Sequence, residues 1–230
     1  MLNFLPGRSS LSSVLLAGLA SVALTVPAMA YEAGDIIVRA GVASVQPDED
    51  SGNLELEGVG KLPGTGAGVD SNEQLGLTLT YMLTSQWGIG VLAATPFEHD
   101  LSARGVGVDA GSTKQLPPTV TLQYFPMDPA SKFQPYVGLG INYTKFFDED
   151  VDSELEGLFG PGDLELDDSF GLAGQVGLDY AIDDHWLLNA SVWYLDIDTT
   201  ADFKFDSGAR IKADVDVDPW VYMVGVGYKF

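Results

Sequence analysis

The chain has 230 residues, of which 33 are acidic and 11 are lysine or arginine, so its formal net charge is −22; it contains no cysteine. The strong negative charge argues against nucleic acid as a partner, because no basic surface offsets phosphate repulsion. The lack of cysteine excludes disulfides, thiolate chemistry and cysteine-bound zinc.

Residues 1–30 have the features of a signal peptide. Arg8 supplies positive charge, residues 11–26 are largely apolar, and residues 28–30 (AMA) have the A-x-A form of a cleavage site. We therefore expect processing after this site, which leaves residues 31–230 as one domain. Because the removed segment carries one arginine and no acid, the net charge of that domain is −23.

Eight stretches of this domain alternate apolar residues with small or polar ones. A period of two predicts β-strands with two different faces. The C-terminal stretch is the clearest, since every even position from Trp220 to Phe230 is apolar or aromatic. No uncharged run in this domain is long enough for a membrane-spanning helix. The predicted strands cover residues 34–44, 72–83, 87–94, 119–124, 133–143, 170–180, 186–194 and 220–230.

The connections between these strands are alternately short and long, as in transmembrane barrels with short periplasmic turns and long extracellular loops. Outward aromatic residues lie near both ends of the strands, as two interfacial girdles require. The sequence therefore predicts an all-β fold: an eight-stranded antiparallel transmembrane β-barrel, residues 31–230, in the outer membrane of a Gram-negative bacterium. The alternative is a soluble lipocalin-like barrel, which would bury its apolar residues inside.

The partners expected of such a barrel are the outer-membrane lipid and lipopolysaccharide around it and the barrel-assembly machinery that inserts it. We expect insertion through the C-terminal strand, because its apolar face ends on aromatic residues. The predicted assembly signal consists of Trp220, Tyr222, Tyr228 and Phe230.

The inward face of the strands predicts a lumen with two different halves. A charged residue such as Arg39, in a strand that crosses lipid, must point into the barrel. The lumen is apolar toward the long loops and polar toward the short turns, and its many glycines leave room. The alternative is that the apolar residues simply pack a filled interior. The predicted substrate path or constriction consists of Leu92, Trp193, Val221 and Met223, and the predicted polar plug of Arg39, Gln123, Gln134, Gln175, Asp179 and Lys229.

Three prolines suggest an opening in the barrel wall. Pro96 ends the third predicted strand, and Pro117 and Pro118 precede the fourth. Because proline cannot donate a ladder hydrogen bond, pairing between these strand ends should fail. The hypothesis is a lateral opening that releases an apolar solute into the bilayer; the alternative is a loop that merely starts early. Normal pairing of residues 92–96 with residues 116–120 would contradict the opening.

Several motifs carry a family resemblance. They are LAATPFEHDL at 92–101, LPPT at 116–119, QPYVGLGINYT at 134–144, SVWYLDIDT at 191–199, and DPWVYM at 218–223 with the strand that follows. Together they resemble the OmpW family of Gram-negative outer-membrane proteins over nearly all of the domain.

The resemblance implies an eight-stranded barrel with a narrow apolar lumen, linked to passive uptake of small hydrophobic molecules, including alkanes in AlkL-like members. It also implies that Leu92 and Trp193 constrict the lumen. A non-transporting structural or surface-interaction barrel, similar to OmpX, is the alternative.

We expect neither an enzyme nor a cofactor. His99 and His185 lie in different connections, so no Ser–His–acid arrangement can be argued from spacing; eight-stranded barrels that modify lipids form the rival class. The third long loop, residues 145–168, is dense in carboxylates, which are the ligands that Ca²⁺ and Mg²⁺ prefer. A solvated, self-repelling loop is the preferred interpretation, and no metal site is predicted.

Overall fold

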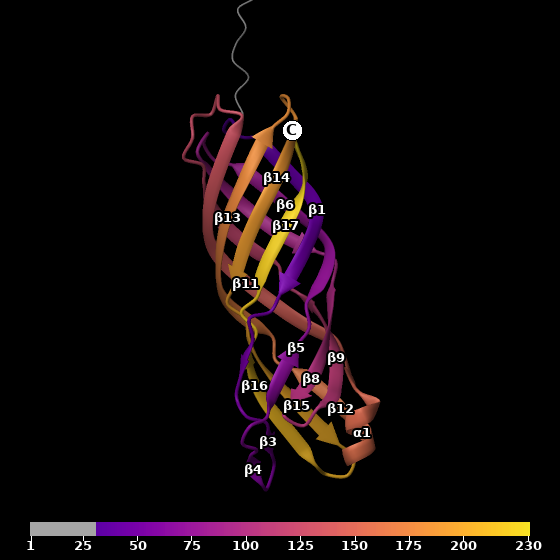
Figure 1. Cartoon of the computed structure of the whole chain (residues 1–230). Helices are drawn as coiled ribbons and strands as arrows, with labels where there is room; N and C mark the ends of the chain where they lie inside the picture. The colour runs from indigo at the N-terminus through magenta and orange to yellow at the C-terminus, as the bar shows by residue number, and fades with distance from the viewer. Residues whose placement is uncertain (1–30) are drawn as a thin grey trace, which may run out of the picture.

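The computed structural model describes residues 31–230, which form a β-barrel and a narrower β-structure stacked on one end of it (Figure 1). The predicted signal peptide, residues 1–30, lies outside the described residues. We call the end of the barrel that carries the second structure the outer end and the opposite end the inner end. The C-terminus lies at the inner end.

Eight antiparallel strands form the barrel: β1 (Ile36–Gln46), β6 (Asn72–Met82), β7 (Trp87–Ala94), β10 (Thr119–Tyr124), β11 (Phe133–Val151), β13 (Ser169–Ala181), β14 (Trp186–Leu195) and β17 (Trp220–Lys229). The sheet closes on itself because β10 pairs with β11 and β1 pairs with β17. Three short connections join strands at the inner end, residues 83–86, 125–132 and 182–185. The predicted fold class is confirmed.

The two faces of each barrel strand differ as the alternation predicts. On β1, Ile37 and Arg39 are buried, whereas Ile36 and Val42 are 39% and 56% exposed on the outside. The outside of the barrel is thus an apolar band suited to lipid. Continuous pairing holds this orientation, since a slip by one residue would turn every side chain to the other face.

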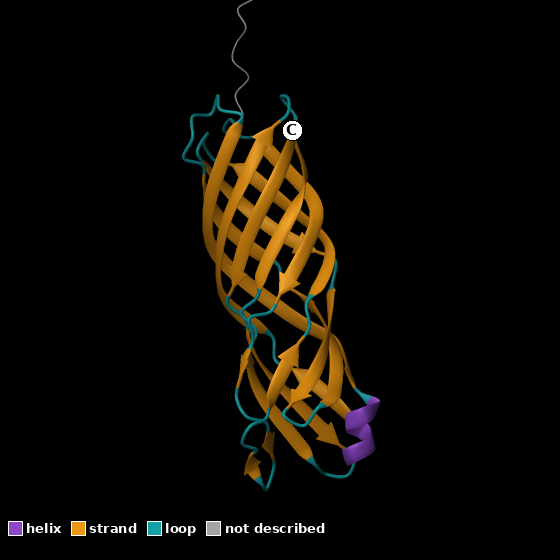
Figure 2. Cartoon of the chain, in the orientation of Figure 1, coloured by secondary structure: helices purple, strands orange, loops and turns teal. Residues whose placement is uncertain are grey.

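The long connections, which we predicted as loops, are folded, and that prediction was wrong. They form a second β-structure that prolongs the barrel (Figure 2). β11 continues into it, and its outer part pairs with β9. The other elements of this structure are β2 (Asp50–Ser51), β3 (Glu55–Leu56), β4 (Gly60–Lys61), β5 (Gly66–Val69), β8 (Phe97–Arg104), β9 (Val108–Leu116), β12 (Gly162–Leu166), β15 (Asp198–Phe205), β16 (Arg210–Asp216) and the helix α1 (Ser153–Phe159).

The physical reason is that these segments alternate apolar with charged residues, and the many charges make this alternation hard to recognise in the sequence. On β15 the side chains of Ala201, Phe203 and Phe205 are buried, while the intervening Asp202 and Lys204 lie on the other face. The charged face is solvated, and the apolar face packs against the opposite sheet, as in any half-buried strand. A high density of acids therefore does not prevent these segments from forming strands.

We call residues 47–71, 95–118, 145–168 and 196–219 the outer extension. One of its sheets contains β12, β15, β16, β3 and β4, and the other contains β5, β8, β9 and the outer part of β11. Their inward side chains form one buried apolar cluster that continues into the barrel and includes Trp193, Phe203 and Ile211. Among residues 31–230 no helix is long and apolar enough to cross a membrane.

Candidate functional site

The four residues of the predicted constriction lie together near the outer end of the barrel. Leu92, Trp193, Val221 and Met223 are all buried, and all belong to the apolar cluster that extends into the outer extension. Trp193 pairs with Val221 between β14 and β17. An eight-stranded barrel has an interior just wide enough for side chains, so a tryptophan at this level fills much of its cross-section.

A hydrogen-bonded network of polar side chains crosses the barrel nearer the inner end. Arg39 donates from Nε and Nη2 to the two carboxylate oxygens of Asp179, at 2.9 and 2.5 Å. Its Nη1 donates to Thr80 Oγ1 at 2.8 Å, and Thr80 donates to Gln123 Oε1 at 3.0 Å. The Gln123 amide then donates to Gln175 Oε1 at 2.8 Å. The network joins four strands and closes the polar half of the lumen.

Two residues of the predicted plug make contacts at the inner end of the barrel. The side-chain amide of Gln134 donates to the carbonyl oxygens of Asp128 and Ser131, so it stabilises the turn between β10 and β11. The Lys229 ammonium lies 3.7 Å from a carboxylate oxygen of Asp35 at the inner rim. The alternation placed both residues inward correctly, but inward position alone does not tell whether a side chain reaches the middle of the lumen or its edge.

Sequence reasoning missed other members of the network, because it looked for charged residues and glutamines. Asn189 donates to Asp179 Oδ1 at 2.8 Å and to the Tyr136 hydroxyl at 3.1 Å. Apart from Tyr31, which precedes the first predicted strand, the missed side chains alternate inward in the sequence, and that signal could have found them. The missed members are Tyr31, Thr80, Thr121, Tyr136, Asn189 and Ser191.

Three aromatic rings in contact close the inner end of the barrel. The Tyr31 ring meets Phe125 edge-on with centroids 5.1 Å apart, and Phe125 lies 5.0 Å from Tyr136. The Tyr31 hydroxyl donates to Asp179 Oδ2 at 2.5 Å, and the Arg39 guanidinium lies 5.3 Å from the centre of the Tyr136 ring. The seal therefore combines burial of aromatic surface with a cation–π contact and a charge-assisted hydrogen bond.

The inward glycines do not leave the lumen empty, which corrects our expectation. A Cβ on Gly177 would lie 2.2 Å from Tyr136 Cζ, and one on Gly90 would lie 2.3 Å from the Gln123 amide nitrogen. The space is therefore occupied by a long side chain from a neighbouring strand. Glycine is required at these positions because a ring or an amide of the network lies directly against the backbone.

Strand pairing is interrupted at the predicted lateral opening. The ladder between β7 and β10 ends at Leu92 and Thr119, and the ladder between β8 and β9 begins at Phe97 and Gln115. Between these pairs, residues 93–96 face residues 116–118 without a ladder bond. We call this interruption the ladder gap.

All three predicted prolines lie within the ladder gap. Its other sides are paired: Thr95 N donates to Leu75 O at 3.2 Å, and Tyr143 N donates to Pro118 O at 3.1 Å. The interruption is therefore confined to one interface, that between the β7–β8 and β9–β10 connections.

A cavity lies within the outer extension, and we call it the outer cavity. Its volume is about 50 Å³, several times the roughly 10–15 Å³ that one water needs. No lysine, arginine, aspartate or glutamate lines it. Its apolar wall comes from both sheets and includes Leu101, Phe146, Phe203, Ile211 and Val215. Most of this lining is apolar, and an apolar cavity of this kind can accept an apolar guest.

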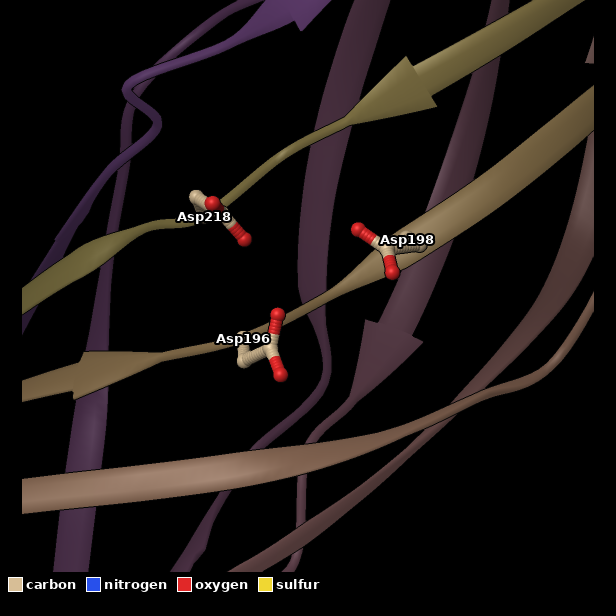
Figure 3. A group of neighbouring side chains, drawn as sticks. All are labelled: Asp196, Asp198 and Asp218. Carbon is tan, nitrogen blue, oxygen red and sulfur yellow. The ribbon is translucent and has the colours of Figure 1, made fainter.

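Three carboxylates gather where the outer extension joins the barrel: Asp196, Asp198 and Asp218 (Figure 3). Each has an oxygen within 4.8 Å of the others. Asp218 accepts hydrogen bonds from the Tyr194 hydroxyl and from Ile197 N, at 2.8 and 3.1 Å. Burial and then the neighbouring carboxylates, Asp216 first, raise the pKa of Asp198. Hydrogen bonds within the protein thus hold the Asp218 carboxylate in place.

The sequence profile of the OmpW family matches residues 32–230. The chain belongs to the OmpW family. Outer membrane protein W of Vibrio cholerae is 49% identical over 208 residues, which cover 89% of this chain and 92% of that protein. The family that the motifs predicted is therefore confirmed.

Two further relatives extend the comparison. The crystal structure of the outer membrane protein OprG from Pseudomonas aeruginosa is 50% identical and superimposes with a TM-score of 0.83, covering 87% of this chain and 97% of that one. Outer membrane protein AlkL of Ectopseudomonas oleovorans is 27% identical over 208 residues, covering 87% of this chain and 84% of that protein. The protein is an outer-membrane β-barrel, as predicted.

Proposed function

We propose that this OmpW-family barrel is a channel for passive uptake of small hydrophobic molecules, with lateral release into the bilayer. The observation that carries the proposal is a continuous apolar interior that ends at a break in the wall. The outer cavity and the constriction residues Leu92 and Trp193 belong to one apolar cluster, and Gln115 both lines the cavity and borders the ladder gap.

The inner end supports a sideways route over a straight one. An apolar solute that moved on toward the periplasm would have to break the Arg39–Asp179 ion pair and the hydrogen bonds attached to it. Leaving such buried polar groups without partners costs about 1–3 kcal/mol for each hydrogen bond and more for a charge. Passage through the ladder gap breaks no backbone hydrogen bond at that interface, because none is formed there.

One observation favours the second candidate, a structural or surface-interaction barrel that transports nothing. The lumen is filled by side chains at the levels of Trp193 and Arg39, and the outer cavity is only about 50 Å³. A channel built this way must widen to pass a solute. The two candidates therefore differ in whether the constriction governs a flux.

The deciding experiment measures uptake of radiolabelled dodecane by cells that lack an OmpW-family protein and by the same cells expressing this one. The variants are Leu92→Ala, which widens the constriction, and Leu92→Trp, which narrows it. The matched control is Leu139→Ala on the outer face of β11, where the side chain is 77% exposed. Heat-modifiable electrophoretic mobility verifies that each variant is folded in the membrane.

We expect protein-dependent uptake that rises in Leu92→Ala, falls in Leu92→Trp and stays unchanged in Leu139→Ala. Uptake equal to that of cells without the protein, with the barrel inserted, would favour the non-transporting barrel. Protein-dependent uptake at the same rate in both Leu92 variants would support a channel whose solute path does not include Leu92.

A further inference from the structure

Two buried polar side chains form a pair at the place where the outer cavity meets the ladder gap. His99 and Gln115 line the cavity and are 2% and 1% exposed. Gln115 pairs with Phe97, which is the first ladder pair on the outer side of the gap. The Gln115 side-chain nitrogen lies 2.9 Å from His99 Nε2. Apart from this pair the polar residues of the wall are Ser102, Thr113 and Thr199, and the rest is apolar. A few polar groups in a mainly apolar wall are the arrangement by which pockets orient a ligand.

The hydrogen bonds of His99 determine which atom of Gln115 is free. His99 Nδ1 lies 2.5 Å from the carbonyl oxygen of Asp70 and must donate to it. Burial lowers the pKa of His99, so the ring is neutral at neutral pH and its Nε2 accepts. The Gln115 amide therefore donates to Nε2 through its nitrogen, and its oxygen Oε1 remains as an acceptor.

The Gln115 oxygen is an acceptor for which the described residues provide no donor. Within residues 31–230 this oxygen accepts no hydrogen bond. Among the same residues, only one side-chain polar atom both lacks a hydrogen-bond partner and is inaccessible to a water-sized probe, and that atom is Thr78 Oγ1. Gln115 Oε1 is therefore not shut off. Since the residue is buried from the outside and lines the outer cavity, the space in front of this oxygen is the cavity.

The charges of the outer extension restrict what this acceptor can bind. The cavity lining contains no ionisable side chain other than the neutral His99, so nothing there offsets the cost of burying a carboxylate or an ammonium group. The segments of the outer extension carry 26 acidic and seven basic side chains, so an anionic amphiphile is repelled before it reaches the cavity. A neutral hydrogen-bond donor remains.

We propose that the outer cavity recognises apolar molecules that carry one neutral hydroxyl group, such as medium-chain primary alcohols, through a hydrogen bond donated to Gln115 Oε1. The cavity takes the head group and the first carbon atoms, while the rest of the chain lies along the apolar cluster toward the ladder gap. This inference rests on the proposed uptake function and adds a substrate class to it. It also assigns Gln115 as a specificity-determining residue.

The test compares three radiolabelled solutes of similar length: dodecan-1-ol, its methyl ether and dodecane. The ether keeps the oxygen but cannot donate a hydrogen bond. Rates are measured at low solute concentration, and the rate in cells lacking the protein is subtracted for each solute. In cells with the wild-type protein we expect the alcohol to exceed the ether by about fivefold, the effect of one ordinary hydrogen bond.

Gln115→Met removes the acceptor at nearly constant volume and should reduce the alcohol-to-ether ratio to about one while dodecane uptake persists. The matched control, Gln86→Met, lies in the inner turn between β6 and β7 and should keep the ratio. A purely structural role of Gln115 would slow all three solutes together and leave the ratio unchanged.

The outcomes separate the two proposals. Protein-dependent uptake of dodecane with equal rates for alcohol and ether overturns the hydroxyl-specific site and leaves the channel standing. No protein-dependent uptake of any solute overturns both. If the Gln115→Met variant does not insert into the membrane, the comparison of alcohol with ether in the wild-type protein still decides whether the site selects a hydroxyl group.

Discussion

Arg39 and Asp179 form a two-point ion pair across the barrel interior, with each side chain only 1% exposed. Both oxygens of the carboxylate are engaged by the guanidinium, and Tyr31 and Asn189 donate to the same carboxylate. The pair thus holds together β1, β13, β14 and the residue at the start of the described chain. Its removal should affect the whole barrel, not one strand.

Asp179→Ala should lower the free energy of unfolding by about 3–5 kcal/mol, because it leaves the Arg39 charge buried without a partner. The measurement is urea-induced unfolding in lipid vesicles. Asp184→Ala, at the exposed turn between β13 and β14, is the control and should change stability by less than about 0.5 kcal/mol.

The double variant Arg39→Met/Asp179→Leu should recover most of the stability that Asp179→Ala loses, because it removes both charges and fills the volume. A double variant no more stable than the single one would show that the network matters through its hydrogen bonds and not through the unpaired charge.

Gly177→Ala should destabilise the barrel by about 1–3 kcal/mol through overpacking. The added Cβ would lie 2.2 Å from Tyr136 Cζ, so the ring would have to leave the aromatic seal. Gly174→Ala on the same strand is the matched control, since a Cβ there meets no atom within 4 Å. Equal unfolding midpoints for the two variants would contradict the tight fit of Tyr136.

Pro117→Ala should reduce solute uptake a few-fold by narrowing the ladder gap. Tyr143 N donates to Pro118 O, so residue 118 points its backbone groups toward β11. Neighbouring residues of a strand point them to opposite sides, and an N–H restored at residue 117 therefore points into the gap. Pro118→Ala, whose new N–H faces β11, is the control. Equal uptake in the two variants would show that solutes are not released through the ladder gap.

The outer extension should be less stable in mild acid because of His99. Burial lowers the pKa of His99 below 6.5. The hydrogen bond to the Asp70 carbonyl and the charges of Asp100 and Asp70 act in the opposite direction, but burial has the larger effect. Below pH 6.5 the unfolded state therefore binds more protons than the folded one. The free energy of unfolding falls as the pH drops from 6.5 through the folded-state pKa.

Amide hydrogen exchange in β8 and β9, at pH 7.5 and pH 5.5 and corrected for intrinsic rates, measures this effect. The wild-type protein should lose more protection at the lower pH than His99→Gln does. His185→Gln, at the exposed inner turn, should behave like the wild type. An identical loss in His99→Gln would assign the effect to the carboxylates instead.

The sequence predicted the barrel well because each strand carries its own signal. Alternation along β6 and β17 separates a face for lipid from a face for the lumen, and that separation is a local property with a period of two. The alternation also placed Leu92, Trp193 and Arg39 inside. The prolines located the ladder gap, because a missing N–H is likewise a property of a single residue.

The outer extension was missed because the outward faces of its strands are crowded with acids. On β16, Ile211, Ala213 and Val215 are buried between Lys212, Asp214 and Asp216. That alternation is present in the sequence, but it stabilises a strand only when a second apolar sheet covers it. The sequence alone does not indicate which segments, some 150 residues away along the chain, will form that covering sheet.

The sequence by itself determined the fold class, the orientation of the side chains and the family, since all three depend on local periodicity and on motifs read in order. Only the tertiary structure decided that the space at Gly177 and Gly90 is filled by Tyr136 and Gln123, that Gln134 bonds to the turn between β10 and β11, and that Gln115 keeps a free acceptor. The physical reason is register. Which side chains meet inside a barrel depends on how neighbouring strands are aligned, and hydrogen bonds between side chains form only after that alignment is set.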